Sequence, residues 1–252
     1  MLLTTTVHST NDSFAFRIND MTFGNVMKLL SVLDAVKHLK RKGWVLMKGS
    51  PISATGHTHR YILKMKSRQR RLCYVLYSSR SIPAALTVPE PETVACHMYR
   101  MAVLAMSLEG QIEGLDVSRA VFMSLVHDLA EAIVGDITPH CGVTDEDKYE
   151  RENQAIQEIA SLVPVAVSGN QWVELWREYE AQNTLEAKVV KHLDKFDMIA
   201  QAYDYERKYG IDLSQFFEST KTAFTMAPFV TWDVELRKQR EEWLKSNRSV
   251  SG

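Results

Sequence analysis

Apolar residues recur at helical spacing along most of the chain. The first apolar stripe lies within residues 26–42 and consists of Leu29, Val32, Leu33, Val36 and Leu39. Similar periodicity predicts a helix that opens at Thr144 and further helices over 93–108, 117–134, 172–181, 185–209, 213–224 and 231–245. We find no alternating runs typical of paired strands and no repeat of fixed period. The pattern therefore predicts an all-α bundle of about six to eight helices in a single domain.

Two ends and one internal segment fall outside this pattern. Residues 1–20 are polar without a sustained period and are predicted to be a flexible tail, as are residues 248–252, which leaves one domain over 21–247. Residues 48–88 contain eight Lys or Arg and no acidic residue; within them, CYVLY at 73–77 could form a short strand. We interpret 48–88 as a long surface insertion, because long loops add little closure entropy. The alternative is an arm that binds RNA or a partner.

Composition and charge restrict the class of protein. The chain has 252 residues, of which 45% are hydrophobic and 24% charged, so a disordered or fibrous chain is excluded. No run approaches the roughly 18 apolar residues of a membrane span, and no secretory signal is visible at the start. We expect an intracellular, cytoplasmic protein that does not bind membranes. Outside the basic segment, 22 basic residues stand against 31 acidic ones. Nucleic acid is therefore an unfavoured partner.

The best candidates for chemistry are charged residues within apolar helical stretches. In HDLAEAIVGDITP at 127–139, His127, Asp128 and Glu131 share one helical surface, and the predicted helix 117–134 looks buried nearly all round. His97 and Asp194 occupy similar positions in two other predicted helices. Buried charges need a partner or a metal ion. Two imidazoles and two carboxylates suit Mn, Co, Fe, Ni or Zn, and carboxylate-rich sites also admit Mg. The alternative reading is a set of hydrogen-bonded core residues.

These residues resemble a known family. His97, the pair His127 and Asp128, and the distant Asp194 match the H…HD…D signature of the HD-domain metal-dependent phosphohydrolases. Together with CHMYRMA at 96–102 and LDKFDM at 193–198, the motif at 127–139 is similar to the 5′-deoxynucleotidase branch. The likeness covers about 27–49 and 89–245. It implies an HD-domain helical bundle, a homodimer, and hydrolysis of deoxyribonucleoside 5′-monophosphates to deoxynucleosides and phosphate.

The resemblance also implies a role for each matching residue. Glu131 would be the general acid or base, while Asp136 would contact the sugar 3′-hydroxyl and Trp44 would line the sugar and phosphate pocket. In eukaryotic members, Glu131 and Asp136 instead hold a second metal. Mn, Co or Mg is the expected ion, with Zn, Fe and Ni as further candidates. The implied ligands of the catalytic metal are His97, His127, Asp128 and Asp194.

One departure from the family pattern concerns the phosphate. Bacterial members place an Arg directly before the Trp, whereas this chain has Gly43 there. Arg41 or Lys42 would have to substitute. Near Asp194, His192 and Asp197 are candidates to support the ligands. Trp172, Trp176 and Tyr179 form a helical stripe that we interpret as core packing, with substrate stacking as the alternative.

Two other functions stay open from the sequence. The first is a different HD-type phosphohydrolase that acts on a dNTP, ppGpp or a cyclic dinucleotide, and the identity of the released phosphate distinguishes it. The absence of a second HD pair favours the monophosphatase. The second is a helical binding scaffold with a vestigial metal site. Deletion of 48–88 would abolish binding by such a scaffold and leave an enzyme active.

Overall fold

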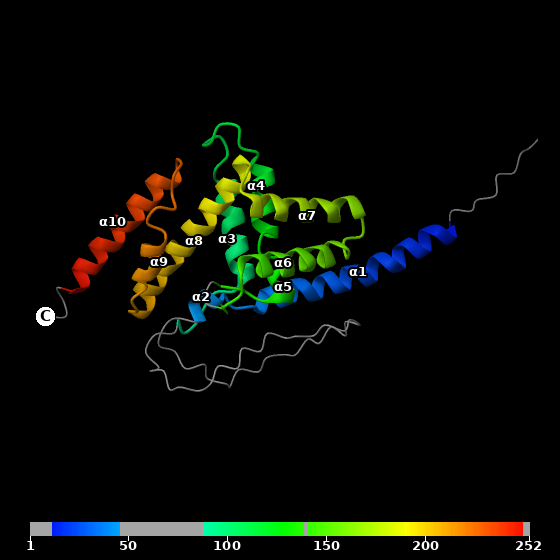
Figure 1. Cartoon of the computed structure of the whole chain (residues 1–252), viewed down its shortest axis with the longest axis horizontal. Helices are drawn as coiled ribbons and strands as arrows, with labels where there is room; N and C mark the ends of the chain where they lie inside the picture. Colours follow the sequence, from blue (N-terminus) through cyan, green and yellow to red (C-terminus); the bar gives the residue numbers. More distant parts are fainter. Residues whose placement is uncertain (1–11, 46–87, 139–140, 249–252) are drawn as a thin grey trace, which may run out of the picture.

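The computed structural model describes residues 12–45, 88–138 and 141–248. Within these ranges the chain forms ten α-helices and no strand, so the predicted all-α class is confirmed (Figure 1). The helices are α1 Asp12–His38, α2 Lys42–Val45, α3 Val94–Met106, α4 Val117–Val126, α5 Glu131–Val134, α6 Asp145–Ala160, α7 Ala166–Ala181, α8 Leu185–Tyr209, α9 Ser214–Ser219 and α10 Phe229–Arg248.

Side-chain caps explain where several helices begin. Thr93, Thr144 and Thr184 each stand directly before a helix, and each hydroxyl accepts a hydrogen bond from the backbone N–H three residues further on. The start predicted at Thr144 is confirmed. The longest predicted bundle helix, 185–209, matches α8 at both ends, and Gly210 closes it in the left-handed conformation with φ 65°.

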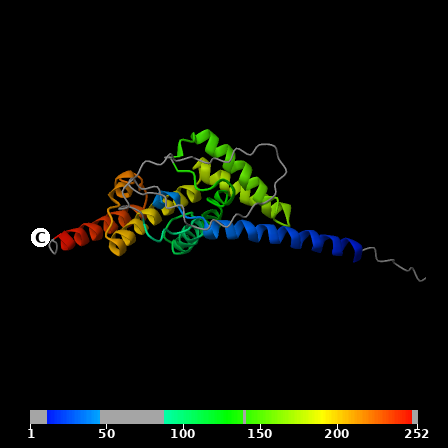
Figure 2. The ribbon, with the colours of Figure 1, turned by 90° about the horizontal axis from the view of Figure 1, so that it is seen from below.

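The first helix begins earlier than its apolar stripe indicates. α1 starts at Asp12, so residues 12–20, which the sequence predicts as a tail, are helical. Helical hydrogen bonds are local, and a helix packed at one end can propagate without further tertiary contacts. Figures 1 and 2 show that the N-terminal part of α1 extends past the bundle. Apolar periodicity indicates only the part of a helix that packs on other elements, so it did not predict the extension of α1 over residues 12–20.

The single helix predicted over 117–134 is wrong in two respects. It is divided into α4 and α5 by a tight turn, in which Leu129 N–H donates to the Val126 carbonyl at 3.0 Å and Glu131 N–H donates to the Asp128 carbonyl at 3.1 Å. The helix is also not buried all round, because the Phe122 side chain is 59% exposed and packing against α3, α7 and α8 covers only part of α4. A short stretch of i to i−3 bonding within a helical region often marks a functional site.

Three helices form the centre of the bundle. α3 packs against α4 and α8, the α6 and α7 pair covers one side, and α10 lies along α8 (Figure 1). Fully buried apolar residues of this core include Met101, Met123 and Leu193. The C-terminal half of α8 packs instead into a second cluster around Trp44 and Leu213. None of the described helices combines the length and apolarity needed to cross a bilayer.

The chain segments on either side of residues 46–87 meet. Arg41 N–H donates to the Glu92 carbonyl at 3.1 Å, and Val94 N–H donates to the Leu39 carbonyl at 2.9 Å. An isolated antiparallel bridge joins Lys40 to Thr93. The interpreted insertion 48–88, except for Val88, and the short strand considered at 73–77 lie outside the described residues. The pairing brings α2 next to the start of α3, which carries His97.

Candidate metal centre

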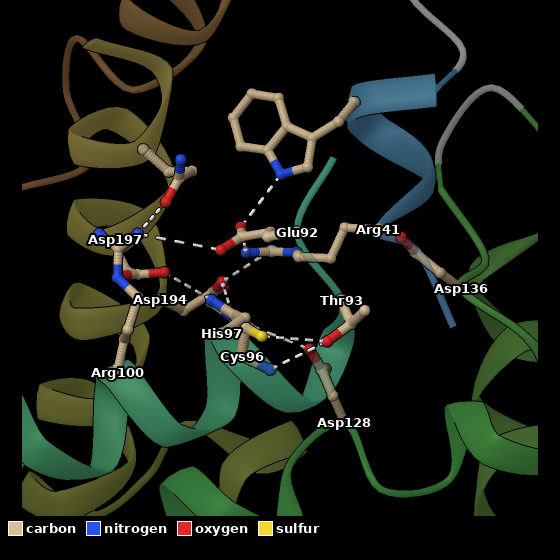
Figure 3. Close-up of polar contacts among 12 residues, drawn as sticks. Arg41, Glu92, Thr93, Cys96, His97, Arg100, Asp128, Asp136, Asp194 and Asp197 are labelled. Atoms are coloured by element: carbon tan, nitrogen blue, oxygen red, sulfur yellow. Dashed lines mark hydrogen bonds and ion pairs between the residues drawn. The ribbon is translucent and has the colours of Figure 1, made fainter. Parts of the chain in front are cut away.

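The structure brings the four predicted metal ligands together from three places in the fold. His97 projects from α3, Asp194 from α8, and His127 and Asp128 from the turn after α4. The His97 Nε2 atom lies 3.4 Å from Asp194 Oδ1 and 3.8 Å from Asp128 Oδ2. Asp128 Oδ2 is also 3.2 Å from His127 Nε2. Figure 3 shows the His97, Asp128 and Asp194 side chains directed toward one another.

The hydrogen bonds of the two histidines leave their Nε2 atoms available. His97 Nδ1 lies 2.8 Å from Asp197 Oδ2, and His127 Nδ1 lies 2.9 Å from the Ser124 carbonyl oxygen. Both partners accept, so each Nδ1 donates its proton to them and Nε2 is the ring nitrogen of each histidine that faces the carboxylates. Both Nε2 atoms are buried without a hydrogen-bond partner. His97, His127 and Asp194 have ligand atoms that all lie within 4.8 Å of one another, and Asp128 adds a carboxylate oxygen 3.2 Å from His127 Nε2. This mixture of nitrogen and oxygen donors fits a divalent metal ion of borderline softness.

Asp197 supports this arrangement from behind His97. Its second oxygen, Oδ1, forms an ion pair with Arg100 Nε at 2.8 Å, and the whole carboxylate is buried. A carboxylate behind a ligating imidazole fixes its tautomer and orientation. Glu92, His97 and Asp197 also lie within ligand distance of one another. The His97 Nδ1 atom is already engaged with Asp197, so this second group is a supporting arrangement and not a further metal site.

The two carboxylates of the ligand set remain ionised. Burial opposes the charged form of Asp194, but the close His97 ring and the charges of Lys195 and Lys191 outweigh burial and hold the pKa of Asp194 well below its usual range. Burial likewise opposes ionisation of Asp128, and the adjacent His127 and His97 lower its pKa. Both groups are therefore anionic at neutral pH, as metal ligands must be.

Glu131 and Asp136 lie next to this set on α5 and the loop that follows. Gly135, at φ 77°, ends α5 and turns the chain, so that Asp136 Oδ2 accepts a hydrogen bond from Lys42 N–H at 2.6 Å. Glu131 is buried, and its Oε2 atom has no hydrogen-bond partner. Burial together with the carboxylates of Asp128 and Asp136 raises the pKa of Glu131 well above its usual range. Burial also raises the pKa of Asp136.

Of the two basic residues considered for the phosphate, Arg41 is the one that reaches the ligand set. Its Nη2 atom lies 3.7 Å from Asp194 Oδ1, and its Nη1 atom donates to Glu92 Oε1 at 3.4 Å. Burial lowers the pKa of Arg41, but the Asp194 and Glu92 carboxylates more than offset this. Lys42 instead points its Nζ atom at Cys141 Sγ, 3.4 Å away.

Trp44 is a core residue at the edge of the site. Its side chain is almost completely buried, its ring centroid lies 4.4 Å from that of Phe216 and 5.3 Å from that of Tyr205, and its Nε1–H donates to Glu92 Oε1 at 3.0 Å. Glu92 therefore accepts from both Trp44 and Arg41 (Figure 3). No sequence pattern indicates this role of Glu92, because it depends on the pairing of 39–41 with 92–94.

Two residues near Asp194 have contacts that differ from those expected from the sequence. Tyr179, interpreted as core packing, donates from its hydroxyl to Asp194 Oδ2 at 3.3 Å. His192, considered as a support for the ligands, has both nitrogens engaged elsewhere: Nδ1 with the Lys188 carbonyl at 2.6 Å and Nε2 with the Thr225 N–H at 3.2 Å. His192 is therefore a structural residue of α8. Sequence spacing could not predict the contact of Tyr179, because Tyr179 lies on α7 and reaches Asp194 only through the packing of α7 on α8.

The HD domain profile matches residues 78–229, well over half of the chain. The chain therefore belongs to the HD domain family.

Named relatives show which branch of the HD domain family the chain belongs to. The chain is 43% identical over 156 residues to 5′-deoxynucleotidase HDDC2 of Homo sapiens, covering 61% of this chain and 74% of that protein. It is 41% identical to 5′-deoxynucleotidase HDDC2 of Dictyostelium discoideum, over 60% of this chain and 85% of that one. The Schizosaccharomyces pombe 5′-deoxynucleotidase hdd1 is also 41% identical, over 64% and 82%. Within the HD domain family, the chain lies in the 5′-deoxynucleotidase branch.

Solved structures agree on the fold. A protein from Pyrococcus horikoshii superposes with a TM-score of 0.56 at 26% identity, covering 85% of this chain and 97% of that one. A predicted metal-dependent phosphohydrolase from Magnetospirillum magnetotacticum superposes with a TM-score of 0.55 over 89% and 96% of the two chains, at 18% identity. The latter likeness concerns the fold alone.

Proposed function

We propose that this protein is a metal-dependent 5′-deoxynucleotidase, which hydrolyses deoxyribonucleoside 5′-monophosphates to deoxynucleosides and phosphate. The observation that carries the proposal is a convergence of four side chains: the Nε2 atoms of His97 and His127, which have no hydrogen-bond partner, each lie within 3.8 Å of the carboxylate of Asp128 or Asp194. The names of the relatives support the choice of substrate class. Another HD-type phosphohydrolase or a binding scaffold has no comparable support.

In this proposal the four ligands would hold one divalent ion, which when bound would supply charge compensation for the phosphoryl oxygens and lower the pKa of water at the site. Mn, Co and Mg are the preferred candidates, with Zn, Fe and Ni as alternatives, because the donor set mixes nitrogen and oxygen. Asp197 and the Ser124 carbonyl keep the two Nε2 atoms in place. This chain's task is to present the ligands in one geometry before substrate arrives.

Glu131 is the proposed general acid or base. Its buried carboxyl has a pKa raised well above the usual range, because burial and the neighbouring Asp128 disfavour its charge. A carboxyl with a raised pKa can hold a proton near neutral pH and exchange it with a water or the leaving oxygen. Asp136, which Lys42 N–H holds at 2.6 Å, is the proposed contact for the sugar 3′-hydroxyl. Trp44 would form the apolar wall of the sugar subsite.

Arg41 is the proposed phosphate-binding residue. It would replace the Arg that bacterial family members carry at the position of Gly43. A guanidinium is a good partner for phosphate oxygens, because its donors have a fixed planar arrangement. Glu92 and Asp194 hold it at the ligand set. With phosphate bound, Arg41 would exchange part of its interaction with Asp194 for the substrate oxygens.

The direct test of the ligand set is Asp128→Ala. We expect the variant to retain helical circular dichroism while phosphate release from dAMP falls about 100-fold or more, because a ligand of the charge-compensating ion is lost. Asp204→Ala on α8 is the matched control, since Asp204 is exposed and pairs with Arg207. Full activity of Asp128→Ala after removal of metal would contradict the proposal.

We also propose a homodimer built on the exposed faces of α3 and α4. Tyr99, Val103 and Met106 of α3 and Phe122 and Leu125 of α4 are all more than 40% exposed, on two helices that pack together. The charged residues of these helices, Arg100 and Arg119, are engaged with Asp197 and Glu178. A neutral apolar surface suits self-association, because the two copies meet without like-charge repulsion.

Sedimentation velocity tests this arrangement. The wild-type protein should sediment as a dimer, with twice the 28.8 kDa mass of one chain, and Phe122→Glu should sediment as a monomer. Val167→Glu on α7, an exposed apolar position away from α3 and α4, should stay dimeric. A monomeric wild type would overturn the dimer proposal.

We further propose a cytoplasmic location, which the free cysteines Cys96 and Cys141 and a nucleotide substrate support.

A further inference from the structure

Tyr179 connects two of the proposed metal ligands from outside the ligand set. Its side chain projects from α7 and is buried. The hydroxyl lies 3.3 Å from Asp194 Oδ2, and the ring packs edge-on against the His127 imidazole with centroids 4.9 Å apart. Asp194 belongs to α8 and His127 follows α4, so one side chain of a third helix contacts ligands from two others.

The direction of the hydrogen bonds at Tyr179 is fixed by its partners. Lys191 Nζ lies 3.1 Å from the hydroxyl oxygen and can only donate. The ionised Asp194 carboxylate can only accept. The hydroxyl oxygen therefore accepts from Lys191, and its proton points at Asp194 Oδ2. Because Lys191 donates to the hydroxyl oxygen, the Tyr179 proton is directed to the Asp194 carboxylate.

This arrangement separates the two oxygens of Asp194. Oδ2 receives the Tyr179 hydroxyl, and both Lys191 Nζ and Lys195 Nζ lie 3.7 Å from it. Oδ1 faces His97 Nε2 at 3.4 Å, and Arg41 Nη2 lies 3.7 Å from it. The Tyr179 hydroxyl therefore engages Oδ2, while Oδ1 is the oxygen beside the His97 Nε2 atom and so the one placed to bind a metal ion.

We infer that Tyr179 is a positioning residue for metal binding: through its hydroxyl it orients Asp194 to coordinate with Oδ1, and through its ring it holds His127. The inference rests on the proposed function, because it takes His127 and Asp194 as ligands. Outer groups of this kind typically contribute about 10- to 100-fold to metal affinity. A residue that only fills the core would contribute packing and leave metal affinity unchanged.

Tyr179→Phe separates the two roles, because it keeps the ring against His127 and removes only the hydroxyl. We expect the Mn affinity of metal-free full-length protein, measured by isothermal titration calorimetry, to fall about 10-fold or more. Phosphate release from dAMP should recover toward the wild-type rate at saturating Mn, because Tyr179 acts through the metal ligands. Tyr149→Phe is the control: this tyrosine lies on α6 with its ring against Trp176, and its affinity should match the wild type.

The outcomes distinguish this inference from the function on which it rests. If wild-type protein binds Mn and Tyr179→Phe binds it equally well, the positioning role is wrong and the metal site stands. If neither the wild type nor Tyr149→Phe binds Mn, Co or Mg, the proposed function fails first. Should Tyr179→Phe lose its helical circular dichroism, Tyr179→Leu tests the hydroxyl and the ring together, with at least the same loss of affinity expected and unchanged affinity as the contrary result.

Discussion

At the scale of single residues, the chemistry of the site depends on which atom of each side chain is left free. Asp197 and a backbone carbonyl engage the Nδ1 atoms of His97 and His127, and the Nε2 atoms remain without hydrogen-bond partners. The identity of these residues could be predicted from the HD motif. Their supporting partners could not, apart from Asp197, because hydrogen bonds between distant residues depend on how the helices pack.

Arg41 gives the sharpest prediction at this scale. We expect Arg41→Met to raise the KM for dAMP about 10- to 100-fold, which corresponds to the loss of a charge-assisted hydrogen bond to phosphate. Its affinity for Mn should stay equal or increase, because a cation beside the ligand set is removed. Lys42→Met is the matched control, since its Nζ atom faces Cys141 and only its backbone holds Asp136.

Steady-state kinetics with purified full-length variants provides the measurement. The assignment of Arg41 as the phosphate-binding residue would be wrong if Lys42→Met raised KM as much as Arg41→Met, or if neither variant changed it. The sequence left both residues open, since spacing to Trp44 cannot tell which of two neighbouring side chains points inward. The structure distinguishes them because residues 39–41 pair with 92–94 and direct Arg41 toward Glu92.

At the scale of elements, the placement of α7 determines whether Tyr179 reaches the ligands. α7 packs closely on the end of α6 near Gly169, where an added Cβ would lie 2.4 Å from the Ala160 carbonyl oxygen. That distance is far below van der Waals contact, and a backbone carbonyl cannot move aside as a flexible side chain can. The glycine therefore permits the close α6 and α7 pairing.

Gly169→Ala should lower the free energy of unfolding by about 1–3 kcal/mol, because the methyl group forces the two helices apart. Gly24→Ala in α1 is the control, since nothing lies within 4 Å of its Cβ position, and the higher helix propensity of alanine should stabilise it by up to about 1 kcal/mol. Urea unfolding followed by circular dichroism measures both. An equal or higher stability for Gly169→Ala would show that the two helices have room at this point.

The division between α4 and α5 shows why elements are harder to predict than residues. Apolar periodicity continues through residues 117–134, so it indicates one helix. The structure tightens the chain at Leu129 and Glu131 into i to i−3 bonds, which directs His127, Asp128 and Glu131 differently from an ideal helix. A hydrophobic pattern reports which side is buried but contains no information on a local change of helical pitch.

At the scale of the whole molecule, the all-α class could be predicted because helical spacing recurs along most of the sequence. The meeting of three helices at one site followed from the family resemblance, not from spacing, since His97 and Asp194 are separated by 97 positions in the printed sequence. The exposed apolar faces of α3 and α4 were not predicted. Periodicity marks an apolar stripe in the same way whether its partner is another helix or a second copy of the chain.

Phosphate release from dAMP and AMP tests the proposed metal-dependent 5′-deoxynucleotidase activity most directly. Full-length protein is first stripped of metal by a chelator and then reconstituted with Mn, Co or Mg. We expect no turnover before reconstitution, recovery with at least one of the three ions, and faster release from dAMP than from AMP. Folded protein that binds these ions and releases no phosphate from either nucleotide would contradict the proposed activity.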